Sequence, residues 1–199
     1  MRRARGYTVV EVMISLAVLA VGTSGIISMQ KVVAATNREA RNLALANQIA
    51  RGWLDRLRTD ATAWNHPVTP TENDDLGDTI WLGQVNSANG AWFRPTDNAL
   101  GYAAADIFGN DVPSSSLARA GFCTNVRLTW LYGAANATPA GSWAIRAEVR
   151  VFWLREGAGG NADDNHVFCD TSMSPDNITA NPTRYHFVYA VAAIPENVL

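Results

Sequence analysis

The feature that most constrains this chain is a long apolar run near its N-terminus, residues 9–29, in which Glu11 is the only charged residue. As an α-helix the run would extend about 30 Å, because each residue adds about 1.5 Å, and this matches the hydrocarbon core of a bilayer. Arginines precede the run at positions 2, 3 and 5. Since basic residues flank membrane helices on the cytoplasmic side, we expect a cytoplasmic N-terminus and an exported domain after Lys31.

Three ordinary kinds of segment fit this run poorly. A secretory signal peptide has an apolar core of about 7–15 residues before a cleavage site of small residues. Residues 33–35 could serve as such a site, but the apolar run at 9–29 is too long for the core. A twin-arginine signal would have an apolar pair after Arg2 and Arg3, where the chain has Ala4 and Arg5. A plain single-pass anchor accounts for the length and leaves Glu11 unexplained.

The residues around Glu11 form a pattern that accounts for the carboxylate. A basic leader, Gly6, the aromatic Tyr7 and then Glu11 stand before the apolar run. This pattern resembles the cleavage site of the type IV pilins and their relatives. The resemblance implies that a prepilin peptidase removes residues 1–6 and that Tyr7, in place of the family's usual phenylalanine, becomes the methylated N-terminal residue.

Cleavage after Gly6 would create an α-amine at Tyr7, whose positive charge is opposite to that of Glu11. Each charge left unpaired in a low-dielectric setting costs about a few kcal/mol or more. The resemblance implies that Glu11 pairs with the N-terminal amine of a neighbouring subunit as helices bundle into a filament. A carboxylate that snorkels to the cytoplasmic interface is the alternative.

The helix is predicted to continue beyond the membrane. Apolar residues recur at spacings of three and four over residues 37–60, among them Leu43, Trp53 and Leu57, which is typical of an amphipathic helix. We therefore expect one helix with a membrane half at 7–30 and an amphipathic half at 31–62. Two glycines interrupt the membrane half, Gly22 and Gly25, and either loosen the helix or permit close helix contacts.

The remaining residues, 63–199, are predicted to form a loop-rich region followed by an antiparallel sheet. Short apolar pieces at 79–82 and 91–93 indicate one or two short strands. Three stronger strands are expected, at 122–131, 143–155 and 185–194. A long helix followed by an antiparallel meander predicts an α+β pilin fold, in which the apolar face of the sheet covers the amphipathic stripe.

The predicted strand at 143–155 alternates between two faces. Ile145, Val149 and Val151 fall on one face, and the charged residues Arg146, Glu148 and Arg150 fall on the other. The first face is therefore the one expected to meet the helix.

Two cysteines, Cys123 and Cys169, are present. An even number fits one disulfide in an oxidising compartment, and two buried free thiols are the alternative. A bridge would constrain the unfolded chain by about 4 kcal/mol on the entropy model. The resemblance supports the bridge, since many pilins fasten their C-terminal loop in this way.

Catalytic and metal-binding patterns are weak. Asp74, Asp75 and Asp78 lie in a carboxylate-rich stretch that could ligate Ca²⁺, but their spacing does not match an EF-hand, and solvated loop acids are the simpler interpretation. The three histidines lack metal-ligand spacing, and no phosphate-binding loop is present. We therefore predict no enzyme and no cofactor. Without residues 1–6 the chain would keep 13 basic and 18 acidic residues, a balance of 13 − 18 = −5, which argues against a nucleic-acid partner.

The opening GYTVVEVMISLAVLAVG resembles in particular the PilV-type minor pilins and the related GspI-type pseudopilins. The resemblance implies a subunit held in the inner membrane with a periplasmic domain and then assembled into a surface pilus near its tip. Implied partners are other minor pilins, the major pilin, the inner-membrane assembly platform, the prepilin peptidase and, as a further candidate, a large tip adhesin. A type II secretion pseudopilin and a membrane-anchored periplasmic binding or enzymatic domain are the alternatives.

Overall fold

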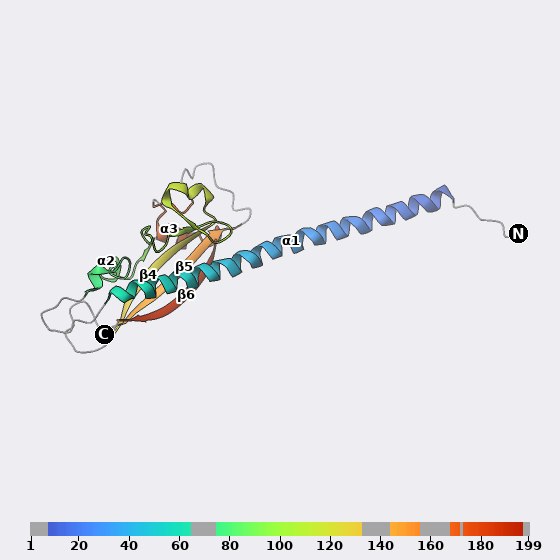
Figure 1. Cartoon of the computed structure of the whole chain (residues 1–199). Helices are drawn as coiled ribbons and strands as arrows, with labels where there is room; N and C mark the ends of the chain where they lie inside the picture. Colours follow the sequence, from blue (N-terminus) through green and yellow to red (C-terminus); the bar gives the residue numbers. More distant parts are fainter. Residues whose placement is uncertain (1–7, 65–74, 133–143, 156–167, 172, 197–199) are drawn as a thin grey trace. The chain divides into compact units, whose positions relative to one another are not determined.

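The computed structural model of this chain describes residues 8–64, 75–132, 144–155, 168–171 and 173–196. It divides into two compact units, residues 1–42 and residues 43–199. The helical and strand elements, drawn in Figure 1, are α1 (Val9–Asp60), η1 (Ala61–Ala63), η2 (Asp75–Asp78), α2 (Gln84–Ala88), β1 (Trp92–Phe93), β2 (Ala104–Ala105), β3 (Asp111–Val112), η3 (Ser114–Arg119), β4 (Phe122–Tyr132), β5 (Ala144–Leu154), α3 (Pro175–Ala180) and β6 (Tyr185–Pro195).

The single long helix of the prediction is confirmed as α1, which contains no proline. Its C-terminal part belongs to the second unit, where Ala46, Ala50, Trp53 and Leu57 are buried. Leu43, which the apolar spacing also placed on the stripe, is 47% exposed, because it lies at the very start of this unit.

The sheet is antiparallel with the strand order β3-β2-β4-β5-β6, and β1 pairs with the edge of β4. Its three long strands confirm the three predicted ones to within a residue or two. Of the two short apolar pieces, residues 91–93 contain β1, whereas residues 79–82 form turns. Alternating residues of β4 and β5, including Val126, Val149 and Val151, belong with α1 to the main hydrophobic core.

The opposite face of the sheet is also covered in part. A second hydrophobic cluster includes Phe152, Ile178 and Tyr185. Two charged residues of β5 that the alternation assigned to this face, Glu148 and Arg150, are buried. Arg150 is covered by residues of α3 and β1, whereas the Glu148 carboxylate forms ion pairs with Arg127 of β4 and Arg146 of β5 itself.

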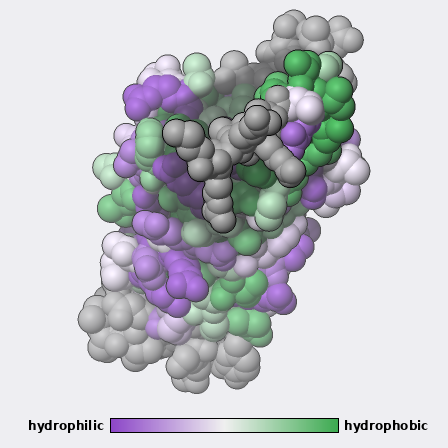
Figure 2. Space-filling model, turned by 90° about the vertical axis from the view of Figure 1, so that its right-hand side faces the viewer, coloured by the Kyte–Doolittle hydropathy of each residue, from purple (hydrophilic) through white to green (hydrophobic). Residues whose placement is uncertain are grey.

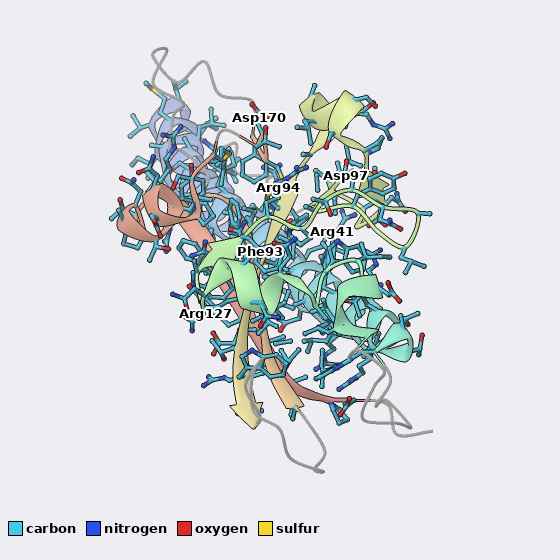
Figure 3. The ribbon with its side chains drawn as sticks, turned by 90° about the vertical axis from the view of Figure 1, so that its left-hand side faces the viewer. Arg41, Phe93, Arg94, Asp97, Arg127 and Asp170 are labelled. Atoms are coloured by element: carbon cyan, nitrogen blue, oxygen red, sulfur yellow. A yellow bond between two sulfur atoms is a disulfide. The ribbon has the colours of Figure 1, made fainter. Side chains whose placement is uncertain are left out.

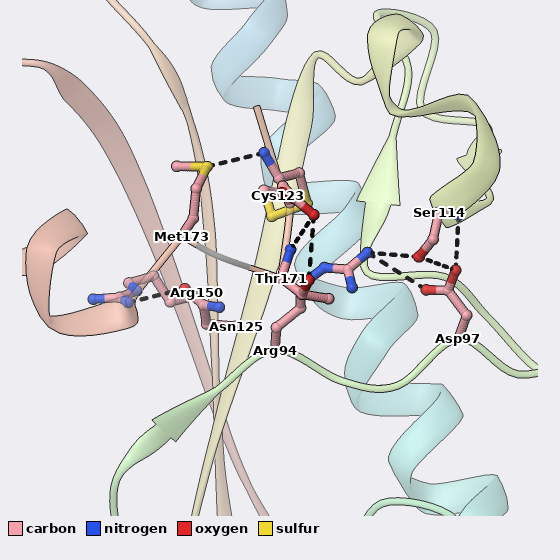
Figure 4. Close-up of a disulfide and its surroundings, with 10 residues drawn as sticks. Arg94, Asp97, Ser114, Cys123, Asn125, Arg150, Thr171 and Met173 are labelled. Atoms are coloured by element: carbon pink, nitrogen blue, oxygen red, sulfur yellow. Dashed lines mark hydrogen bonds and ion pairs between the residues drawn. A yellow bond between two sulfur atoms is a disulfide. The ribbon is translucent and has the colours of Figure 1, made fainter. Parts of the chain in front are cut away.

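Arg150 is surrounded by groups that accept its hydrogen bonds. Its guanidinium donates to Asn125 Oδ1 at 2.9 Å (Figure 4). It also donates to Thr179 Oγ1 at 2.6 Å and to the carbonyl of Pro175 at 3.2 Å. It also lies 4.6 Å from the centre of the Trp92 ring. Burial lowers the pKa of the Arg150 guanidinium, and Tyr189 acts in the opposite direction. These contacts connect α3 and β1 to the centre of the sheet.

The end of α1 is fixed by a buried carboxylate. Asp60 is 3% exposed, and its oxygens accept hydrogen bonds from the backbone N–H groups of Ile80 at 2.7 Å, Trp81 at 2.8 Å and Leu82 at 3.0 Å. Three of the four amides of this apolar piece are therefore satisfied by one carboxylate, and the fourth, that of Thr79, donates to the carbonyl of Leu76 at 3.3 Å, so none pairs with a neighbouring strand.

Replacement of Asp60 by alanine should lower the free energy of unfolding by about 3 kcal/mol, because three amide donors would lose their acceptor. The measurement is denaturant unfolding of the full chain in detergent, followed by tryptophan fluorescence. Asp55→Ala is the matched control on the same helix: Asp55 is 70% exposed, pairs only with Arg58 among the described residues, and should change stability by about 0.5 kcal/mol or less. Equal losses in the two variants would contradict this role for Asp60.

A second buried carboxylate holds the turn between β2 and β3. Asp106 accepts hydrogen bonds from the backbone N–H of Phe108 at 2.8 Å and from the backbone N–H and side-chain amide of Asn110 at 2.9 and 3.1 Å. Burial alone would raise the pKa of Asp106. These hydrogen bonds and the Arg119 guanidinium outweigh that effect and hold the pKa below its ordinary value of 3.8.

The lowered pKa predicts how this turn responds to acid. Asp106 contributes stability that is fully present above its ordinary pKa and is lost as the pH falls through the lower pKa of the folded state. The wild-type chain should therefore lose more unfolding free energy than Asp106→Asn when the pH is lowered from 5 towards about 2. Unfolding curves at a series of pH values test this, and parallel pH profiles for the two proteins would refute it.

Candidate functional site

The first unit of the structure leaves its apolar side chains uncovered. Between Val9 and Val33, the large apolar residues of α1 are exposed by 48% to 77%, and no other described residue packs over them. By length and composition, α1 is the one described helix that could cross a membrane. On the face drawn in Figure 2, apolar side chains in green lie among hydrophilic ones in purple, so apolar surface is not confined to the interior.

The hydroxyl groups of this half of α1 are satisfied within the helix itself. Each donates to a backbone carbonyl three or four residues earlier, at 2.8–3.0 Å: Ser15 to Glu11, Thr23 to Leu19 and Ala20, Ser24 to Val21, and Ser28 to Gly25. Such bonds allow serine and threonine to lie in hydrocarbon without an unpaired polar group.

The carboxylate of Glu11 differs from these hydroxyl groups. It lies in the first turn of α1 and is exposed. Among the residues that the structure describes, none hydrogen-bonds or forms an ion pair with its carboxylate. The carboxylate therefore remains available to a group from outside the described chain.

Thr8, a residue that the sequence prediction overlooked, sets the start of this helix. Its Oγ1 accepts a hydrogen bond from the backbone N–H of Glu11 at 3.3 Å, which makes Thr8 the N-cap and Glu11 the third helical residue. A threonine followed three residues later by a glutamate is the capping-box pattern, and it was visible in the sequence. Glu11 thus also lies at the positive end of the helix dipole, where a carboxylate is stabilised.

The other residues singled out from the sequence lie partly outside the described part of the chain. Gly6 and Tyr7 fall outside the described residues, as does Asp74. Asp75 and Asp78 belong to η2, and no group of three or more His, Cys, Asp or Glu side chains among the described residues could hold a metal ion. A Cβ added to Gly22 or Gly25 would meet nothing within 4 Å, so both positions lie open on the helix surface.

Cys123 and Cys169 are joined by a disulfide, with their Cα atoms 5.4 Å apart. Both are buried, and the bridge fastens the segment before α3 to the start of β4. A polar network lies beside it, in which Arg94 donates to Ser114 Oγ at 3.2 Å and Ser114 Oγ donates to Asp97 at 2.6 Å (Figure 4). Arg94 and Asp97 are also labelled in Figure 3. The disulfide interpretation is confirmed, and this region serves to hold the domain together.

Comparisons with known proteins bear on the N-terminal part alone. Residues 1–27 match the family described as the prokaryotic N-terminal methylation motif. No curated protein and no solved structure matches the chain.

The matched motif and the fold point to one class of protein. The motif, together with an apolar N-terminal helix and an antiparallel sheet, supports a type IV pilin-like or pseudopilin-like protein. Such proteins are generally structural, and the motif implies that the partners include pilus assembly machinery. The apolar helix fits anchoring in a membrane before assembly.

Proposed function

We propose that this protein is a minor pilin of a type IV pilus. It is a non-catalytic subunit that helps to initiate filament assembly in a complex with other minor pilins at the tip. The observation that carries the proposal is Glu11, a carboxylate without a described partner in a helix whose hydroxyl groups satisfy themselves. The N-terminal amine of a neighbouring subunit supplies the missing opposite charge when the helices bundle.

In this proposal the chain has a leader, an anchor and one pilin domain. Residues 1–6 are removed by a prepilin peptidase, and the new N-terminal residue, Tyr7, is methylated. Residues 7–30 hold the protein in the inner membrane and later pack in the filament. Residues 31–62 form the amphipathic half of the helix, which makes up the periplasmic domain together with residues 63–199.

The proposed partners follow from the stages of assembly. Other minor pilins and the major pilin contact the subunit in the filament, and the inner-membrane assembly platform moves it out of the bilayer. A large tip adhesin is a further candidate. The Val-rich opening and the stretch Glu-Val-Met-Ile-Ser support the PilV-type group, whose relatives include the GspI-type pseudopilins of type II secretion.

Processing can be tested on the protein isolated from cells that produce it. The mature chain should begin at Tyr7 and carry one added methyl group on its α-amine, as measured by intact mass and by sequencing of the N-terminal peptide. Gly6→Val should retain the leader, and Gly22→Ala, a matched change within the helix, should be processed normally. An intact Met1 in the wild-type protein, or a cut near residue 35, would exclude the pilin interpretation.

The role of Glu11 can be separated from its place in the capping box. Glutamine can serve as the third residue of a capping box but has no charge, whereas alanine can neither serve in a capping box nor carry a charge. If Glu11 acts by charge pairing, Glu11→Gln and Glu11→Ala should both reduce incorporation into sheared surface pili by at least about tenfold, which corresponds to about 1.4 kcal/mol. Thr8→Ser, which keeps the cap, should assemble normally.

The readout is the amount of each variant in pili relative to its amount in the membrane fraction. Normal incorporation of Glu11→Gln would show that capping alone matters and would contradict the proposed pairing. Deletion of the protein distinguishes the two related systems: loss of surface pili with intact secretion supports a minor pilin, and the reverse result supports a pseudopilin.

A further inference from the structure

β6 is the last strand of the sheet and has one long free edge. It pairs only with β5 among the described strands, through a register that runs without a shift from Ala144 opposite Pro195 to Leu154 opposite Tyr185 (Figure 1). In an antiparallel strand, alternate residues direct their N–H and C=O groups away from the neighbouring strand. Among the described residues, the far side of β6 from Phe187 onward therefore presents a row of backbone donors and acceptors, whereas the carbonyl of Tyr185 at the start of the strand already accepts a hydrogen bond from Arg155 Nε at 3.1 Å.

The sequence of β6 contains none of the usual obstacles to further pairing. Exposed edges are commonly protected by charged side chains, prolines, bulges or short length. β6 is 11 residues long, reads YHFVYAVAAIP, contains no Asp, Glu, Lys or Arg, and has its proline at the last position. The opposite end of the sheet differs: β3 has two residues, and its Asp111 forms an ion pair with Arg56 at 2.7 Å.

The side chains of β6 indicate which kind of strand could be added. Val188 and Ile194 belong to the main core, and Ala190 and Ala192 pack against it. On the other face, Tyr189 and Val191 are 57% and 53% exposed. A strand added beside β6 would extend both rows, so side chains on both of its faces would meet apolar neighbours.

A second copy of this chain is a poor occupant of the edge. α1 and β6 run in the same general direction within the second unit (Figure 1). Antiparallel pairing of two β6 strands would therefore place the Leu43 ends of the two helices at opposite ends of the pair, although both chains enter from one membrane. Parallel pairing would turn one sheet over relative to the other, so the core-facing side chains of one β6 would lie beside the exposed side chains of the other.

We propose that the free edge of β6 binds an extended, uncharged, apolar β-strand from a different protein by strand addition. Main-chain hydrogen bonds along the edge supply the attraction, and the two rows of apolar side chains select the partner. This inference goes beyond the proposed function and shares with it only the anchoring of α1 in a membrane.

Photo-crosslinking of the full chain in the cells that naturally produce it tests the proposal. A benzoylphenylalanine is placed at position 189 or at position 191, and the crosslinked residue is mapped by mass spectrometry. Moving the probe by two residues along β6 should move the crosslinked residue by two on one extended segment of another protein. The same probe at Ile107, which is 61% exposed in the turn between β2 and β3, is the control and should show no such relation.

Two neighbouring proline variants, Ala190→Pro and Val191→Pro, provide a second measurement. Because N–H groups alternate in direction along a strand, one of these two substitutions removes an N–H that faces β5 and the other removes an N–H that faces the free edge. The first kind of loss should unfold the domain. The second should leave the thermal midpoint nearly unchanged. The folded variant should lower the crosslinking yield from position 189 by at least tenfold. Crosslinks to a second copy of this chain, crosslinks without a two-residue relation, or an unchanged yield in the folded variant would overturn the proposal.

Discussion

The domain depends on close packing between one face of α1 and the inner face of the antiparallel sheet. Ala46 and Ala50 are fully buried at this contact, and Trp53 and Leu57 fill the space beside them. Burial of apolar surface is the main favourable term in folding, and this stripe obtains it within the chain. Between Val9 and Val33, the same helix exposes its large apolar side chains, and only lipid or other helices could bury them.

Periodicity in the sequence was sufficient to predict the long elements. α1, β4, β5 and β6 each bury one face, so their apolar residues recur every three to four positions in the helix and every second position in the strands. β2 and β3 have two residues each and carry no periodicity. They exist because β2 pairs with β4 and because Asp106 closes the turn between them, and both contacts depend on the folded domain.

The buried charged residues show a second limit to what can be predicted from the sequence. Alternation placed Glu148 and Arg150 on the correct face of β5, but only the structure shows that both side chains are buried there. Of the candidate site, Glu11 follows from a short local motif, and Thr8 could have been found from the same four residues. The roles assigned to Gly6 and Tyr7 stay predictions, because these residues lie outside the part of the chain that the structure describes.

The position of the disulfide has a consequence for how the chain responds to proteolysis. Cys123 and Cys169 are 46 residues apart in sequence, and the covalent ring that they close contains all of β5 and nearly all of β4. A protease that cuts the backbone once, anywhere inside this ring, produces two fragments that remain joined through sulfur. An extracellular protein with this arrangement can be nicked between its two central strands and still keep α1 and β6 in one covalent molecule.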